Sequence, residues 1–190
     1  MHFTDTVYRE MQSEGVFMDE TLTDDALVAI ARHDVEAFAM LYRRHLHRVY
    51  SYLLSRAGNV HDAQDLTTQT FVVALNAIET YQPRGLFVAW LLGIARRKLS
   101  DHFRDGIPTI AIEDIDVQLA NQDVLEEAVV MILAKLNPER AEAIRLRYLA
   151  NLKIREVAEV MGKSEGAIKM LLARGLDDIR QALGIQEKIS

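Results

Sequence analysis

Residues 160–175 read VMGKSEGAIKMLLARG, and this stretch decides how the C-terminal part of the chain folds. Gly162 predicts the end of one helix, and Ser164 predicts the N-cap of the next. A short break between two amphipathic helices is typical of a helix-turn-helix, whose second helix enters the major groove of DNA. A helical hairpin with a solvated, charged face is the alternative interpretation of the same pattern.

Helical periodicity also dominates the rest of the chain, and it predicts an all-α fold without strands. Gly58 ends one long helix, Asn59 caps the next, and Asn137 followed by Pro138 starts another. Pro83 and Gly85 predict a loop. The predicted helices cover residues 24–32, 35–56, 59–79, 86–103, 125–136, 137–150, 153–161 and 164–183.

Charge is distributed unevenly along the 190 residues, whose formal net charge is −6. Residues 1–41 carry −7, residues 42–105 carry +4, residues 106–127 carry −6 and residues 128–190 carry +3. Because the sign changes at each candidate boundary, two small basic helical domains with acidic flanks are indicated. The predicted limits are an acidic arm over 1–22, domains over 23–105 and 124–186, and a flexible acidic linker over 106–123.

Composition excludes several classes of protein. The chain has no cysteine, which rules out disulfides and cysteine-based zinc sites. It shows no secretory signal and no apolar run long enough to span a bilayer, so a cytoplasmic protein without membrane insertion is expected. The six histidines lack metal-ligand spacing, and no nucleophile–base pair stands out. We therefore expect no enzymatic activity, no catalytic residue, no metal and no cofactor.

Two segments resemble regions of bacterial sigma factors. Residues 136–183, LNPERAEAIRLRYLANLKIREVAEVMGKSEGAIKMLLARGLDDIRQAL, resemble sigma region 4, which reads the −35 promoter element. Residues 37–104 look like sigma region 2. Two such regions joined by a short linker are the layout of the extracytoplasmic-function (ECF) sigma factors of the sigma-70 family. The resemblance implies a protein that directs promoter recognition, promoter melting and transcription initiation at a subset of genes.

The resemblance implies a helix that docks on the polymerase. In the family, a D-A-E-D-L-x-Q-E-x-F pattern binds a coiled coil of the largest polymerase subunit, and residues 62–71 here read DAQDLTTQTF. Gln64 replaces an acid of that pattern, which leaves fewer charges for a basic partner. The implied core-binding residues are Asp62, Gln64, Asp65, Leu66 and Gln69.

The following loop and helix are implied to open the promoter. In the family, the loop captures a base flipped from the non-template strand, and the helix holds the rest of the −10 element. Planar side chains stack on bases, and cations bind the phosphate backbone. Trp90 lies on an apolar stripe and is interpreted as core, as are Phe71 and Tyr42. The implied −10 residues are Tyr81, Arg84, Arg96, Arg97, Lys98 and Arg104.

The implied −35 contacts lie in the helix-turn-helix. Free amides near Ser164 suit a phosphate, and cations on the outer face suit phosphates or guanine edges. Leu171 and Ala173 stand where the family often has basic residues, so fewer contacts than usual are expected. The implied set is Lys163, Ser164, Glu165, Lys169, Met170 and Arg174.

The resemblance implies core RNA polymerase (β and β′ subunits), promoter DNA and an anti-sigma factor as partners. Linker acids Glu113, Asp114 and Asp116 either contact the polymerase cleft or belong to a plain tether. Two alternatives to a sigma factor stay open. One is a stand-alone helix-turn-helix regulator, which leaves residues 62–71 and 81–104 unexplained. The other is a protein-binding adaptor on a degenerate sigma scaffold, which would account for the small number of basic residues on the helix over 164–183.

Overall fold

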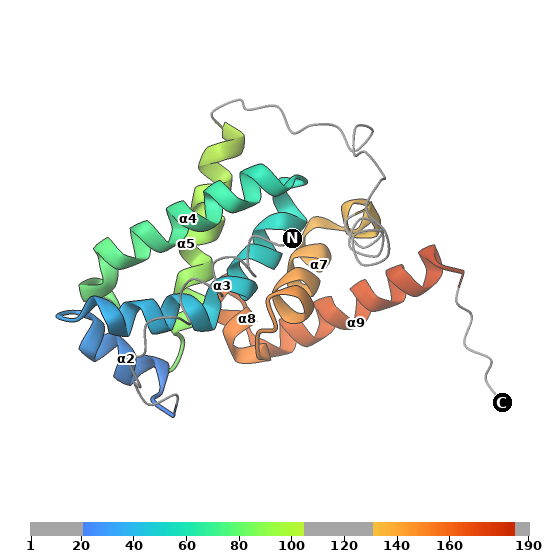
Figure 1. Cartoon of the computed structure of the whole chain (residues 1–190). Coiled ribbons are helices and arrows are strands. Elements are labelled where there is room, and N and C mark those ends of the chain that lie inside the picture. Colours follow the sequence, from blue (N-terminus) through green and yellow to red (C-terminus); the bar gives the residue numbers. More distant parts are fainter. Residues whose placement is uncertain (1–20, 105–130, 185–190) are drawn as a thin grey trace.

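A computed structural model describes residues 21–104, the N-terminal block, and residues 131–184, the C-terminal block (Figure 1). The predicted linker and nearly all of the predicted arm lie outside these residues. All regular structure within the two blocks is helical, which confirms the all-α prediction, and no helix in them is long and apolar enough to cross a membrane. The elements are α2 (Asp24–Ala31), α3 (Val35–Ala57), α4 (Val60–Ala77), η1 (Ile78–Thr80), α5 (Phe87–Arg104), α7 (Pro138–Ile144), η3 (Arg145–Leu149), α8 (Ile154–Met161) and α9 (Glu165–Ala182).

The predicted caps begin and end these helices as expected. Gly58 ends α3 in the left-handed conformation (φ 77°), and the Asn59 side chain accepts a hydrogen bond from the Asp62 amide at 2.8 Å. Asn137 caps α7, with Pro138 in its first turn. Ser164 caps α9 by accepting from the Ala167 amide at 3.2 Å. These boundaries were predictable because capping is local chemistry.

The predicted helix over 137–150 changes its winding halfway. α7 ends at Ile144, and residues 145–149 form a π-helix that is closed by the Ala150 amide donating to the Arg145 carbonyl at 2.9 Å. A π turn holds an extra residue, which rotates the side chains that follow it. Leu146 is therefore buried, while Tyr148 is exposed.

In the N-terminal block, α3 is the central helix, and α2, α4 and α5 pack against it (Figure 1). Phe71 is buried as predicted, and Tyr42 meets it edge-on with ring centroids 4.6 Å apart. Trp90 is half-buried against Phe87, at 5.6 Å between centroids. These aromatic contacts hold α4 and the start of α5 in place.

The C-terminal block is built on a close approach of α7 and α9. Gly175 faces α7 so closely that a Cβ atom there would lie 2.7 Å from Cδ1 of Ile144 and 3.3 Å from Cβ of Arg140. Arg140 also donates both to Oδ1 and to Oδ2 of Asp178, at 2.9 and 2.7 Å. The block is completed by α8, which packs against α9.

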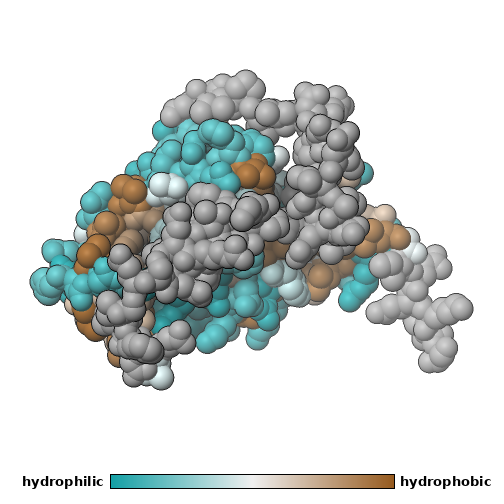
Figure 2. Space-filling view, in the orientation of Figure 1, coloured by the Kyte–Doolittle hydropathy of each residue, from teal (hydrophilic) through white to brown (hydrophobic). Residues whose placement is uncertain are grey.

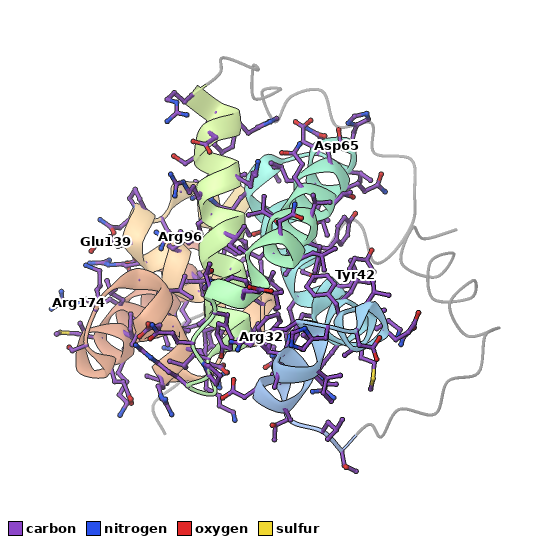
Figure 3. The ribbon with its side chains drawn as sticks, turned by 90° about the vertical axis from the view of Figure 1, so that its left-hand side faces the viewer. Arg32, Tyr42, Asp65, Arg96, Glu139 and Arg174 are labelled. Atoms are coloured by element: carbon purple, nitrogen blue, oxygen red, sulfur yellow. The ribbon has the colours of Figure 1, made fainter. Side chains whose placement is uncertain are left out.

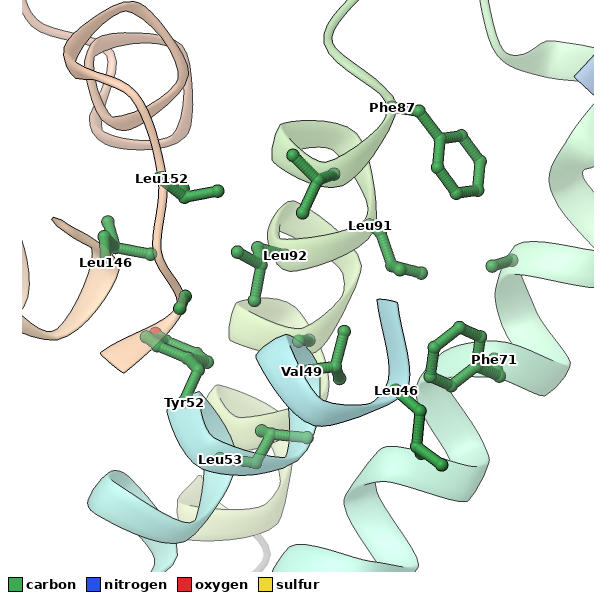
Figure 4. Packing of buried hydrophobic residues seen from close by; sticks show 14 of the residues in the cluster. Leu46, Val49, Tyr52, Leu53, Phe71, Phe87, Leu91, Leu92, Leu146 and Leu152 are labelled. Carbon is green, nitrogen blue, oxygen red and sulfur yellow. The ribbon is translucent and has the colours of Figure 1, made fainter. Parts of the chain in front are cut away.

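The two blocks share one apolar core. α5 packs against α8, and α3 packs against η3. Figure 4 shows Leu146 and Leu152 of the C-terminal block directed toward Leu92 and Tyr52 of the N-terminal block, and all four side chains are fully buried. Burial of this kind is worth roughly 25 cal/mol per Å² of apolar surface, so the contact holds the blocks together.

α2 is fixed to α3 by one carboxylate. Asp24 accepts from Arg44 Nη1 at 2.7 Å and lies 2.9 Å from His45 Nε2. Burial disfavours the charged form of Asp24, but the hydrogen bonds and charges of His45 and Arg44 outweigh burial and lower its pKa to about 2. Ionised Asp24 therefore stabilises the folded chain.

We expect this stabilisation to depend on pH. Asp24 is ionised in the folded chain down to about pH 2, whereas the ordinary pKa is 3.8, so its contribution is complete above pH 4 and is lost as the pH falls toward 2. Asp24→Asn should lower the free energy of unfolding by about 1 to 2 kcal/mol at pH 6, with solvent screening taken into account. Denaturant titrations at pH 6 and pH 2.5 check this, since the gap between wild type and variant should shrink at the lower pH.

Two glycines of α9 provide a second test. Gly175→Val should lower the free energy of unfolding by about 1 to 3 kcal/mol, because its side chain overlaps α7. Gly166→Val is the matched control, since the only atom near its Cβ position is 4.0 Å away. Thermal unfolding followed by circular dichroism should show a clear drop for position 175 alone, and equal drops would contradict the close approach.

Candidate nucleic-acid interface

The predicted functional residues fall on three surfaces of the molecule. Figure 3 places Asp65 on the outer side of α4, Arg96 between α5 and the C-terminal block, and Arg174 on α9, away from the N-terminal block. The three predicted sets therefore do not form one site. Each surface has its own chemistry.

The first surface is the acidic face of α4. The side chain of Asp65 is 64% exposed and lies 3.5 Å from His61 Nδ1. Asp62 is less free, because it accepts from Asn59 Nδ2 at 2.8 Å and lies 3.3 Å from His102 Nε2. Gln69 is exposed and Gln64 half-exposed. This face offers one largely exposed carboxylate and two amides to a partner.

Leu66 is the one member of the predicted set on α4 that lies in the core. Its side chain is buried in the core of the N-terminal block, so it supports the helix and is not on the surface. Val72 and Leu75, one and two turns beyond Thr68, are exposed instead. Figure 2 shows apolar residues among the polar surface around this helix. Helical periodicity alone would place both on the apolar stripe with Phe71, so their exposure is a result of tertiary packing.

The second surface is a cleft of about 520 Å³ beside the loop that precedes α5. Arg84, Trp90 and Arg97 line it from the N-terminal block, and Glu159 of α8 lines it from the other side. Arg84 and Arg97 are exposed, and Trp90 presents part of its ring. Two guanidinium groups beside an indole ring suit a nucleic-acid base and its phosphates.

Tyr81 also borders this cleft, but its ring belongs to the core. The residue is only 4% exposed, and its ring meets Phe87 and Trp90 at 5.4 and 5.3 Å between centroids. Burial and the hydrogen bond from its hydroxyl to Asp25 raise the pKa of Tyr81 to about 12. The predicted stacking role thus gives way to a structural one in this conformation.

The remaining −10 candidates on α5 point in different directions. Arg96 turns to the C-terminal block, where Nη1 donates to the Val160 carbonyl and Nε lies 3.1 Å from Glu142 Oε1. Lys98 is half-buried, and Arg104 is exposed and pairs with Asp101 at 2.9 Å. α5 therefore presents its cations to the cleft, to the interface between the blocks and to solvent.

That interface contains a partly buried polar cluster, the interdomain cluster, of Tyr52, Arg56, Arg96, Glu142 and Arg145, in which the two arginines of the N-terminal block are half-exposed. The Tyr52 hydroxyl donates to Glu142 Oε1 at 2.8 Å, and Arg56 Nη1 lies 3.8 Å from Oε2. Burial, the charge of Glu142 and this hydrogen bond raise the pKa of Tyr52, so its hydroxyl stays a donor. Burial and the charge of Arg56 lower the pKa of Arg145.

Charge in the interdomain cluster is unbalanced. One carboxylate faces three guanidinium groups, and Nε of Arg145, a residue only 6% exposed, has no hydrogen-bond partner. A second contact joins the blocks nearby, where Arg155 of α8 donates to the Arg84 carbonyl at 3.0 Å. The sequence analysis missed these contacts. The sequence feature that could have indicated a buried ion pair is Glu142, an acid that stands between two alanines in α7.

The third surface is the helix-turn-helix of α8 and α9. Gly162 ends α8 with φ 63°, and Lys169, Met170 and Arg174 project from α9 into solvent. Lys163 pairs with Glu139 of α7 at 2.8 Å. The Ser164 hydroxyl accepts from the Ala167 amide and so caps α9. The face free for a DNA groove is therefore Glu165, Lys169, Met170 and Arg174.

None of these surfaces is a metal site. Within residues 21–104 and 131–184, no three His, Asp or Glu side chains gather in a way that could hold a metal ion. What the described surfaces offer is recognition by charge, planar groups and a groove-sized helix.

Comparison with known proteins assigns both blocks. A family model described as sigma-70 region 2 matches residues 41–106, and one described as sigma-70 region 4 matches residues 126–179. The ECF RNA polymerase sigma factor SigC of Mycobacterium tuberculosis is 32% identical over 170 residues, which cover 84% of this chain and 89% of SigC. The ECF RNA polymerase sigma factor BldN of Streptomyces coelicolor is 36% identical over 162 residues, which cover 79% of this chain. The match spans 61% of BldN and 60% of SigE of Mycolicibacterium smegmatis.

Solved structures are similar as well. CnrH, solved in complex with the cytosolic domain of CnrY, superposes with a TM-score of 0.66 at 27% identity, covering 86% of this chain and 99% of CnrH. The sigma factor RpoE of Bartonella quintana, solved with the anti-sigma factor NepR, gives 0.66 at 19% identity, covering 80% of this chain and 99% of that chain, and supports the fold.

The interdomain cluster gives a testable prediction. Glu142→Gln leaves three guanidinium groups without a counter-charge, so docking of the two blocks should weaken by about 1 to 3 kcal/mol. Small-angle scattering should show a larger radius of gyration, and amide exchange at Leu146 and Leu152 should accelerate. Glu139→Gln on the same helix removes only a surface pair with Lys163 and should change neither measurement. An unchanged scattering profile for Glu142→Gln would contradict this role.

Proposed function

The chain belongs to the ECF group of the sigma-70 family, and we propose that it binds core RNA polymerase and directs promoter recognition, promoter melting and transcription initiation at a subset of genes. The observation that carries the proposal is the presence of three separate recognition surfaces, on α4, beside α5 and on α9, in one chain with both sigma regions. A stand-alone helix-turn-helix regulator accounts for α8 and α9 alone.

The outer face of α4 is the proposed contact with the polymerase β′ subunit. Asp65 and Gln69 are exposed and offer charge-assisted and neutral hydrogen bonds. Val72 and Leu75, which are exposed further along the same helix, add apolar surface to this contact. Asp62 supports this face, because its bond with Asn59 fixes the start of α4. Replacement of a family acid by Gln64 reduces the charge that this contact uses.

The cleft beside α5 is the proposed site for the −10 element. Arg84 and Arg97 supply positive charge, and Trp90 supplies a planar face for an unpaired base. Arg96 belongs to the same helix but is engaged by Glu142 and Val160. Its two bonds to the C-terminal block therefore compete with a contact to DNA phosphates. Lys98 and Arg104 are proposed as further phosphate contacts.

The outer face of α9 is the proposed reader of the −35 element. Lys169 and Arg174 can bind phosphates or guanine edges, and Met170 offers apolar contact. The Glu165 end supplies backbone amides at a helix start. Because Lys163 is paired and Leu171 and Ala173 are uncharged, this face is weakly basic. Binding to promoter DNA is therefore expected to depend on the polymerase.

Regulation by an anti-sigma factor in the cytoplasm is part of the proposal. CnrH, which is similar over nearly its whole length, was solved in complex with the cytosolic domain of another protein, CnrY. A partner of this kind would cover surfaces that polymerase or DNA requires. The chain itself would carry no catalytic residue and no cofactor, because the polymerase performs the chemistry.

Transcription by core polymerase of the encoding bacterium tests the proposal. A panel of genomic promoters is transcribed with and without the chain, and initiation at a subset that needs the chain is the expected result. Duplex binding without polymerase would instead identify a stand-alone regulator. Polymerase binding without initiation at any promoter would identify the adaptor that the weakly basic face of α9 also suits.

Two variants of α9 sharpen the test. Arg174→Ala should lower initiation about 5- to 100-fold at promoters with an intact −35 element, which corresponds to about 1 to 3 kcal/mol. Arg180→Ala is the control, because Arg180 lies at the far end of α9 and pairs with Asp177 at 2.7 Å. Initiation should change only with the first variant. Equal initiation by the two variants would show that Arg174 does not contact the promoter.

A further inference from the structure

One carboxylate of α2 joins both ends of the loop that precedes α5. Asp25 Oδ1 accepts from the Tyr81 hydroxyl at 2.8 Å, and Oδ2 accepts from the Gly85 amide at 2.7 Å. The two donors are four residues apart in the chain. Asp25 therefore closes the loop from outside, since α2 lies more than fifty positions earlier in the sequence.

The rest of the loop is arranged around this bridge. The Leu86 amide donates to the Tyr81 hydroxyl oxygen at 3.3 Å, and Arg32, the C-cap residue of α2, donates to the Tyr81 carbonyl at 3.2 Å. Gly85 has φ +65°, a conformation that other residues rarely adopt. Between the two fixed ends, residues 82–84 are exposed. The base of the loop is thus held by α2, while the tip exposes its side chains and is held on the other side by Arg155 of α8, which donates to the Arg84 carbonyl at 3.0 Å.

A carboxylate suits both ends of the loop. It has two acceptor oxygens and no donor, so it can accept from a hydroxyl and an amide at once. The neighbouring Asp24 does not contact the loop in this way, because it binds Arg44 and His45 of α3. Asp25 is not among the residues that line the cleft beside the loop. Its effect on anything bound there must pass through the loop.

We propose that Asp25 is a positioning residue for promoter melting, which holds the loop tip at residues 82–84 in the shape that receives an unpaired base. The inference rests on the proposed function, because it assigns the loop to base capture. Unpairing a base costs a few kcal/mol, and a receptor that is already shaped loses less conformational entropy on capture. A fixed tip also distinguishes one base from another, whereas a mobile tip accepts several.

The test uses holoenzyme on a promoter that wild type opens. One measurement is the affinity for four single-stranded non-template −10 oligonucleotides that differ only at the base position wild type discriminates most strongly. The other is the opening rate of the duplex promoter, followed by 2-aminopurine fluorescence, compared with a template whose −10 region is already mismatched. The mismatched template needs no base capture to open.

Asp25→Ala removes both hydrogen bonds. We expect the preference for the best base over the worst to fall at least 5-fold and duplex opening to slow about 10-fold, with activity restored on the mismatched template. Tyr81→Phe removes one of the two bonds and should fall between wild type and Asp25→Ala. The double variant should resemble Asp25→Ala alone, because both act through the same bridge.

A control separates positioning from loss of stability. Val49→Ala truncates a fully buried side chain in the middle of α3 and should destabilise the N-terminal block without touching the loop. Its base preference should match wild type even where its melting temperature is as low as that of Asp25→Ala. Unchanged base preference in Asp25→Ala overturns the positioning role alone. A wild-type holoenzyme that opens no promoter overturns the proposed function, and the role of Asp25 falls with it.

Discussion

The buried carboxylate of Glu142 is the constraint on which the arrangement of the two blocks depends. It accepts from Tyr52 of α3 and pairs with Arg96 of α5, so one side chain from α7 ties down two helices of the other block. A buried charge is tolerable only when it is paired and hydrogen-bonded. The apolar side chains of Leu146, Leu152 and Leu92 pack near Tyr52 on one side of this polar centre, whereas the Arg96 side chain on the other side is 40% exposed.

This packing decides which recognition surfaces face solvent together. The outer faces of α4 and α9 point in different directions and are both accessible, as Figure 3 shows for Asp65 and Arg174. The cleft beside α5 is shared, because Glu159 and Val160 of α8 form its opposite wall. The described structure therefore combines two open surfaces with one that the second block covers in part.

The sequence was sufficient for features that neighbouring residues determine. Helix ends at Gly58, Asn59 and Ser164 follow from local capping, and the outward face of α9 follows from helical periodicity. It was insufficient where distant segments meet. Leu66 and Tyr81 fit motifs for binding, yet tertiary packing buries both. Glu142 could not be paired with Tyr52 in advance, because the two lie 90 positions apart.

Two hydrogen bonds between the blocks end on main-chain carbonyls. Arg96 donates to the carbonyl of Val160, and Arg155 donates to that of Arg84. A carbonyl is present whatever the side chain, so positions 160 and 84 can vary among homologues without loss of these bonds, while the two arginines cannot. Pairs of covarying positions in an alignment would therefore not reveal these two hydrogen bonds. Only conservation of the donor arginines, Arg96 and Arg155, would indicate them.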